Sequence, residues 1–241
     1  MVRNITTAIT MKSLLSPLIL ILCTFTSYGA DEILYVFYPL TTRPQQVQES
    51  LQKSLEGVEV TVFGRVNDLS ARVAAAPPDA ILTKPLLLEQ FDAYTITSSG
   101  LRNGSPDETY VIVSIDTPIR IESVHSETVI GVIDVLGRNA MKTFILPLFP
   151  SEPRLKQVTK VEDLLPLLTF TMADGIMIEE VFLPYFQKTS NLSFKISSPI
   201  TPQSGIIALA YRKDFDTRTI AGQLAKENQS INKLFEIEKW K

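Results

Sequence analysis

The segment GRVNDLSARVAAAPPDAILTKPLLLEQF, residues 64–91, is matched later in the chain by TKVEDLLPLLTFTMADGIMIEEVFLPYF, residues 159–186. The match extends without a gap over residues 35–91 and 130–186. Both copies carry the same residue at seven positions in these two segments: Val66 and Val161, Asp68 and Asp163, Leu69 and Leu164, Asp79 and Asp174, Ile81 and Ile176, Leu88 and Leu183, Phe91 and Phe186. Each copy has the pattern of an α/β unit. The repeat therefore predicts two similar lobes with a cleft between them, and such clefts commonly hold ligands.

The composition is that of an ordinary globular protein, with 45% hydrophobic and 20% charged residues. The net charge is −3, and no stretch of the sequence forms a basic face. Proteins that bind nucleic acids neutralise phosphates with clustered lysine and arginine. We therefore expect no nucleic-acid partner.

The first 30 residues have the pattern of a secretory signal peptide. Lys12 precedes an apolar run at residues 14–24, and a more polar stretch follows it. This order is typical of secretory signals, and the run is short for a helix that spans a bilayer. We expect cleavage near Gly29 or Ala30 and a periplasmic location. Translation starts at Met1 or Met11, and the sequence leaves both open.

The single cysteine and the single histidine limit the available chemistry. Cys23 lies inside the signal run, and the bulky Leu22 before it disfavours lipid attachment. The mature chain then has no cysteine and no disulfide. His125 lies in a polar segment, where no Ser-His-Asp set or transition-metal cluster can be built around it. We expect no catalytic residue, no metal and no cofactor, so the chain is predicted not to be an enzyme.

Apolar runs and helical periodicity give the order of elements in the first unit. Strands are expected at residues 32–38, 58–63 and 79–82, each followed by a helix. Thr41 or Thr42 can cap the first helix, and Asn67 or Asp68 the second. The βαβαβα order predicts a parallel sheet with helices on its faces. The second unit repeats the order between residues 129 and 178.

The remaining segments of the sequence indicate where the two lobes begin and end. Strands at residues 94–97 and 110–113 flank a polar turn, and Asp116-Thr117-Pro118 then reads as the hinge. A strand at residues 205–211 returns to the first lobe, and an amphipathic helix at the C-terminus packs on it. The predicted organisation is a signal at 1–30, lobe 1 at 31–117 completed by 204–241, and lobe 2 at 118–203.

Four short motifs lie at distinctive places in this order. They are Tyr38-Pro39 followed by Pro44, Asp79-Ala80, Asp116-Thr117-Pro118-Ile119, and Ile130-Gly131-Val132. With the export signal and the element order, they resemble the periplasmic solute-binding proteins of ABC importers with the type II fold. The closest resemblance is to the phosphate/phosphonate-binding (PhnD-like) branch. It implies two lobes, each a mostly parallel sheet flanked by helices, joined by hinge strands.

Two loops depart from that family. In this chain the segment Leu136-Gly137-Arg138-Asn139 precedes the first helix of lobe 2, where the family commonly has a loop rich in serine and threonine. Thr83-Lys84 stands where glycine or serine is common, and the mature chain is short for the family. Because of these differences, the resemblance alone does not imply that this chain binds an anion.

Ligands of parallel α/β sheets bind beyond the carboxyl ends of the strands. Four loops qualify, and the helix N-termini that follow three of them attract anions. The candidate ligand-binding residues are Tyr38, Thr41, Thr42, Thr83, Lys84, Gly137, Arg138, Asn139 and Glu179. Each candidate also has a purely structural interpretation. The threonines could cap a helix, and Lys84 could be a solvated lysine at the rim of the cleft. Arg138 could cover the end of a helix, and Glu179 could be an exposed surface residue. Glu179 or Glu180 could also pair with Lys84 across the cleft as a closure latch.

The sequence thus predicts an exported, monomeric protein that captures a small, anionic, phosphate- or phosphonate-like solute between two lobes. It would pass the solute to an ABC permease. The alternative is a sensory or accessory protein of the cell envelope with the same fold and no transport role.

Overall fold

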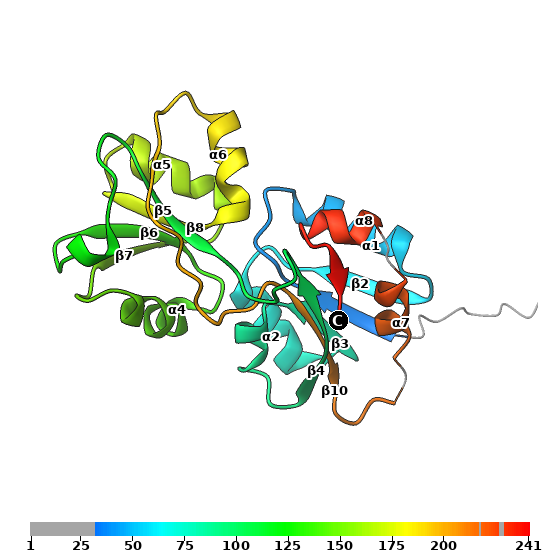
Figure 1. Ribbon diagram of the computed structural model, residues 1–241. Helices are drawn as coiled ribbons and strands as arrows, with labels where there is room; N and C mark the ends of the chain where they lie inside the picture. The colour runs from blue at the N-terminus through cyan, green and yellow to red at the C-terminus, as the bar shows by residue number, and fades with distance from the viewer. Residues whose placement is uncertain (1–31, 217, 227–228) are drawn as a thin grey trace, which may run out of the picture.

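The computed structural model describes residues 32–216, 218–226 and 229–241. The expected signal peptide, its cleavage site and both candidate start codons lie outside these residues. The described chain forms two lobes that lie side by side, joined by segments that cross between them (Figure 1). Lobe 1 carries a six-stranded sheet and lobe 2 a five-stranded one.

The sheet of lobe 1 has the order β11-β4-β10-β3-β1-β2. Its strands are β1 (Glu32–Val36), β2 (Val58–Val62), β3 (Ala80–Thr83), β4 (Tyr94–Leu101), β10 (Ala208–Arg212) and β11 (Lys239–Trp240). β1 pairs in parallel with β2 and β3, whereas β10 is antiparallel to β3 and β4. Its helices are α1 (Pro44–Ser54), α2 (Val66–Ala75), α3 (Pro85–Leu88), α7 (Thr219–Ala225) and α8 (Gln229–Leu234).

The sheet of lobe 2 has the order β7-β6-β8-β5-β9. Its strands are β5 (Tyr110–Ser114), β6 (Val129–Ile133), β7 (Arg154–Val158), β8 (Gly175–Glu179) and β9 (Lys195–Ile196). Its helices are α4 (Arg138–Ile145), α5 (Leu164–Thr169) and α6 (Leu183–Thr189), with 3-10 turns η1 (Ile121–Ser123), η2 (Leu146–Leu148), η3 (Val161–Asp163) and η4 (Glu180–Phe182). Together the two lobes form the predicted α/β fold.

The sequence repeat corresponds to a structural repeat, but not without a gap. Leu34 pairs with Ala80 and Ile130 pairs with Gly175, so the first strands are offset by 96 residues (130 − 34) and the third strands by 95 (175 − 80). β2-β1-β3 in lobe 1 and β7-β6-β8 in lobe 2 have the same order and the same parallel pairing. The repeated aspartates make the same bond in both lobes. Asp79 Oδ2 accepts from the backbone N–H of Ile33 at 2.9 Å, and Asp174 Oδ2 accepts from that of Val129 at 2.7 Å. Each aspartate thus fixes the start of the third strand to the first strand, which explains its place in the repeat.

Three local expectations were wrong. The N-cap of α1 is Arg43 rather than Thr41 or Thr42, because Pro44 occupies the first helical turn, where its missing N–H costs nothing. α2 begins after Arg65, so neither Asn67 nor Asp68 caps it. The expected hinge at residues 116–118 is a turn inside lobe 2, because β5 before it already pairs with β8.

The chain crosses between the lobes at residues 102–109 and returns at residues 200–206. The two crossings are hydrogen-bonded to each other: Tyr110 and Ile200 exchange two backbone bonds of 2.7 and 2.8 Å, and Ile206 N donates to Pro106 O at 2.7 Å. Paired crossings of this kind form a two-stranded hinge. The returning strand enters lobe 1 as β10, as expected.

Two apolar cores hold the structure together. One face of the lobe 1 sheet packs against α1 and the C-terminal helices α7 and α8. The almost fully buried residues of this core include Leu51, Ile220, Leu224, Ile231 and Phe235. The predicted C-terminal stripe therefore packs on lobe 1. The second core joins the other face of that sheet to the whole of lobe 2.

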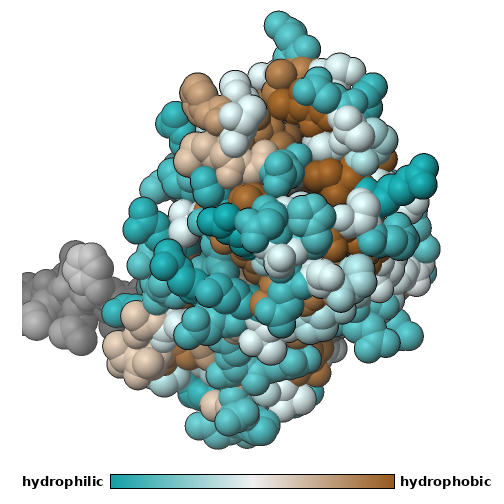
Figure 2. Space-filling view, turned by 90° about the vertical axis from the view of Figure 1, so that its left-hand side faces the viewer, coloured by the Kyte–Doolittle hydropathy of each residue, from teal (hydrophilic) through white to brown (hydrophobic). Residues whose placement is uncertain are grey.

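Apolar side chains also reach the surface in places. Figure 2 views the molecule from the lobe 2 side and shows hydrophilic residues interspersed with a few hydrophobic patches. Phe170 and Met172, in the turn after α5, are 69% and 46% exposed. Among the described residues, no helix combines the length and the apolar content needed to span a membrane.

Candidate functional site

A cluster of buried charged side chains lies where the two lobes meet. Lys84 follows β3 of lobe 1, and Glu179 ends β8 of lobe 2. Lys84 Nζ lies 3.0 Å from Glu179 Oε1, and both side chains are only 2% exposed. The Tyr38 hydroxyl donates to Glu179 Oε2 at 3.2 Å, and the Lys84 ammonium lies 5.1 Å from the centroid of the Tyr38 ring. Three of the candidate residues therefore contact one another.

The first crossing segment adds two further ionisable groups, Arg102 and Glu108, to this cluster. Glu108 is 1% exposed; its Oε1 lies 2.6 Å from Arg102 Nη1, and its Oε2 lies 3.9 Å from Lys84 Nζ. Arg102 also donates to the backbone carbonyls of Glu236, at 2.6 Å, and Phe235, at 3.3 Å. The cluster thus connects both lobes, the hinge and the turn after α8.

Burial changes the proton affinity of these groups. Burial alone would lower the pKa of Lys84, but the acidic groups around it, Glu179 foremost, together outweigh burial, and the pKa lies well above its ordinary value. Burial, followed by the charge of Glu179, raises the pKa of Glu108 to about 8, although Lys84 and Arg102 oppose the shift. Burial and Glu179 likewise raise the pKa of Tyr38. Lys84 is therefore held as a cation, and the pKa of Glu108 lies close to neutral pH.

Thr83, also a candidate, is fully buried beside Lys84. Its hydroxyl has no hydrogen-bond partner among the described residues, and neither does Glu108 Oε2. Buried polar atoms without partners are uncommon in folded proteins. They mark this cluster as a place where the polar groups are not fully satisfied.

The loop before α4 lies apart from this cluster. Gly137 has a φ of 90°, which favours glycine, and its N–H donates to Asp134 Oδ1 at 2.7 Å. Arg138 and Asn139 are exposed. The Arg138 carbonyl accepts from Gln157 Nε2 at 2.9 Å. The structure therefore does not bring these three candidates together with Lys84 and Glu179.

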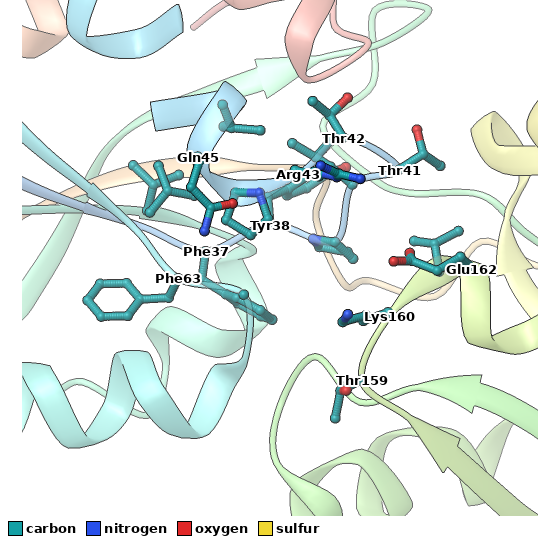
Figure 3. A pocket seen from close by; sticks show the side chains of 18 residues that line it. Phe37, Tyr38, Thr41, Thr42, Arg43, Gln45, Phe63, Thr159, Lys160 and Glu162 are labelled. Atoms are coloured by element: carbon teal, nitrogen blue, oxygen red, sulfur yellow. The ribbon is translucent and has the colours of Figure 1, made fainter. Parts of the chain in front are cut away.

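Thr41 and Thr42 lie between two cavities. The first, of about 530 Å³, is bounded by the loop from β1 to α1 in lobe 1 and by Thr159, Lys160 and Glu162 in lobe 2. Figure 3 shows Lys160 and Glu162 extending from lobe 2 toward the loop that carries Thr41, Thr42 and Arg43. The second, of about 1160 Å³, lies on the other side of this loop, against the hinge and α6.

Three residues that matter here are absent from the candidates predicted from the sequence: Lys160 in the first cavity, and Arg102 and Glu108 in the buried cluster. Arg43, which also lines the first cavity, ends one of the four loops expected to bind a ligand. The repeat contained a signal for Lys160. It occupies the position of Arg65 in the other copy, directly after the second strand. Nothing in the local pattern marks Arg102 or Glu108, because their partners come from distant segments.

No described group of three or more His, Cys, Asp or Glu side chains is placed to hold a metal ion. The chemistry of the site is that of hydroxyls, ammonium and guanidinium groups and carboxylates. Such groups bind and orient a polar solute by hydrogen bonds and charge.

Neither a family model nor a curated protein matches the sequence. Several solved structures match the fold. A Xanthomonas citri protein bound to ATP is 12% identical, with 87% of this chain and 90% of that chain covered and a TM-score of 0.59. The binding protein component of an ABC phosphonate transporter from Pseudomonas aeruginosa is 11% identical. The match covers 87% of this chain and 81% of that chain, with a TM-score of 0.60.

The periplasmic VFT2 domain of Bordetella pertussis BvgS is 15% identical, with 85% of this chain and 92% of that domain covered and a TM-score of 0.53. At these identities the likeness concerns the fold. The chain has the two-lobe architecture of periplasmic binding proteins, the type II fold expected from its sequence.

Proposed function

We propose that the protein captures a small anionic solute between its lobes, in the cavity lined by Thr41, Thr42, Arg43, Thr159 and Lys160. The observation that carries the proposal is that both lobes contribute polar and basic side chains to this one cavity. Its volume of about 530 Å³ falls in the ordinary range for small-molecule sites. Phosphate- or phosphonate-like solutes are the proposed class.

The charges around the cavity favour an anion. Arg43 and Lys160 bring two positive charges, and Glu162 brings one negative charge. The N-terminus of α1 borders the same space, and its dipole attracts negative charge. Threonine hydroxyls can donate hydrogen bonds to the oxygens of the solute. Binding would draw the two lobes together about the paired crossings.

In its cellular role, the protein would be exported, act as a monomer, bind without catalysing a reaction, and deliver its solute to an ABC permease. The match to a phosphonate-transporter component supports this role at the level of the fold. A permease and an ATPase encoded beside the gene would support it further.

One observation favours a sensory or accessory role instead. The buried contact between Lys84 and Glu179 joins the two lobes through the protein's own side chains. A protein that must open to load and release solute gains nothing from such a contact. A protein that signals through a fixed lobe arrangement does gain from it.

The test is a thermal-shift screen of the protein from Ala30 onward against phosphate, phosphonates, sulfate, carboxylates and amino acids. A ligand at 100 times its dissociation constant stabilises by about 2.7 kcal/mol, or roughly 5–10 °C for a chain of this size. We expect an anionic hit that is lost in Lys160→Ala and Arg43→Ala.

Arg138→Ala is the matched control, because Arg138 is exposed and does not line this cavity. An anion hit that survives in both cavity variants, or that disappears in Arg138→Ala, would place the site elsewhere. No hit from any anion would reject solute capture in this cavity and favour the accessory role.

A further inference from the structure

Glu179 occupies a position that an external carboxylate could fill. Its side chain extends from the end of β8 in lobe 2 and meets donors that belong to lobe 1. One oxygen lies 3.0 Å from Lys84 Nζ, and the other accepts from the Tyr38 hydroxyl at 3.2 Å. A carboxylate held at both oxygens by an ammonium and a hydroxyl is bound as a ligand would be.

The lobe 1 side of this contact is preformed. Lys84 Nζ also lies 3.4 Å from the carbonyl of Ile206, which comes from the returning crossing. The Tyr38 ring packs edge-on against Phe235, with the ring centroids 5.6 Å apart. Donors supported in this way keep their positions whether or not a carboxylate lies between them.

The contact is unusual because both charges are buried. Removing an ammonium and a carboxylate from water is costly, and packed apolar residues often replace such pairs without loss of stability. The pair therefore has a role that stability alone does not explain. Joining lobe 1 to lobe 2 through one carboxylate is such a role.

We propose that Lys84 and Tyr38 form a carboxylate-binding site in lobe 1 that the protein fills with its own Glu179, so that the lobes close around an internal ligand. Tyr38 also borders the cavity lined by Arg43 and Lys160, whereas Lys84 and Glu179 are not among the residues that line it. When Glu179 leaves, the site accepts a small free carboxylate such as formate or acetate.

The test is chemical rescue. Glu179→Ala leaves a vacancy of the size of a carboxylate beside Lys84. We expect the variant to melt at a lower temperature than wild type, and sodium formate or acetate to raise its melting temperature saturably, on the order of 5 °C. Sodium chloride at the same ionic strength should not reproduce the rise.

Four control proteins make the assay specific. Wild type and Glu180→Ala keep the internal carboxylate and should show no saturable rise, because Glu180 is the exposed neighbour of Glu179. The double variant Lys84→Met/Glu179→Ala lacks the ammonium and should also show none. Lys160→Ala/Glu179→Ala should still respond. Loss of the response in this last variant would mean that acetate binds in the other cavity, and it would overturn the inference.

Should Glu179→Ala fail to fold, Glu179→Gln provides the second measurement, because it keeps the shape and removes the charge. In small-angle scattering without solute, we expect Glu179→Gln to have a larger radius of gyration than wild type and Glu180→Gln to match wild type. Equal scattering from Glu179→Gln and wild type would overturn the internal-ligand role, whatever the solute screen gives.

Discussion

Replacing Lys84 by methionine tests how strongly the buried pair joins the lobes. The 3.0 Å separation of Lys84 Nζ and Glu179 Oε1 corresponds to a gross attraction of about 5 kcal/mol at an effective dielectric constant of about 20. Removing one partner leaves the other charge buried and unpaired, which typically costs about 3–5 kcal/mol. We therefore expect Lys84→Met and Glu179→Leu each to lower the free energy of unfolding by about that amount.

The double variant Lys84→Met/Glu179→Leu should lose much less than the sum of the two, because it leaves no unpaired charge from this pair. A coupling energy of about 2–3 kcal/mol is expected, at the upper end for contacting residues. Urea unfolding of the four proteins of the cycle measures it. Lys160→Met is the control: this exposed lysine should change stability by less than about 0.5 kcal/mol. Additivity within about 0.5 kcal/mol would refute the reasoning.

Three further predictions concern groups outside that pair. Burial and the neighbouring lobe 2 carboxylate raise the pKa of Glu108 from 4.5 to about 8. The folded state therefore holds a proton that the unfolded chain releases, and stability should fall as pH rises from about 4.5 to 8, by up to about 1.4 kcal/mol per pH unit. Glu108→Gln should flatten this slope in urea titrations at several pH values, and an unchanged slope would contradict the assignment. Gly205→Ala should cost about 1–3 kcal/mol by calorimetry, because φ is +67° and a Cβ would collide with a proline ring. Gly222→Ala, in α7 with open space around it, should instead gain about 0.5–1 kcal/mol, and equal effects of the two would count against the steric argument. Glu32→Gln should lower the free energy of unfolding by about 1–3 kcal/mol, because the buried carboxylate accepts from the Tyr211 hydroxyl and the first N–H groups of α7. A loss below about 0.5 kcal/mol in chemical denaturation would show that the amide serves equally well.

The repeat was the part of the fold that the sequence predicted best. A strand buried on both faces, such as Leu34 to Val36, needs a continuous apolar run, and such runs are visible without a structure. The same holds for the order of β1, β2 and β3 and of their counterparts in lobe 2. The alternative in which Glu179 pairs with Lys84 also followed from the repeat, because the two residues occupy equivalent positions in the two copies.

The parts that were missed depend on long-range contacts. The hinge was placed at residues 116–118 because that segment has turn-forming residues. Whether a polar turn lies between sheets or inside one is decided by strand pairing, which the local pattern does not contain. In the same way, the local sequence around Glu108 indicates an exposed acidic residue. It is buried only because Arg102 and Lys84 come to it from other segments.

The place of β10 in the sheet has a consequence for the order in which the two lobes fold. β4 pairs with β10 and β11, and both follow lobe 2 in the sequence, whereas every strand of lobe 2 lies between residues 110 and 196. Lobe 2 can therefore be completed first, although lobe 1 begins first. Until β10 has joined the sheet, β3 and β4 have open edges, which are sites for wrong pairing and for chaperones. The sheet of the N-terminal lobe is therefore the last to be completed.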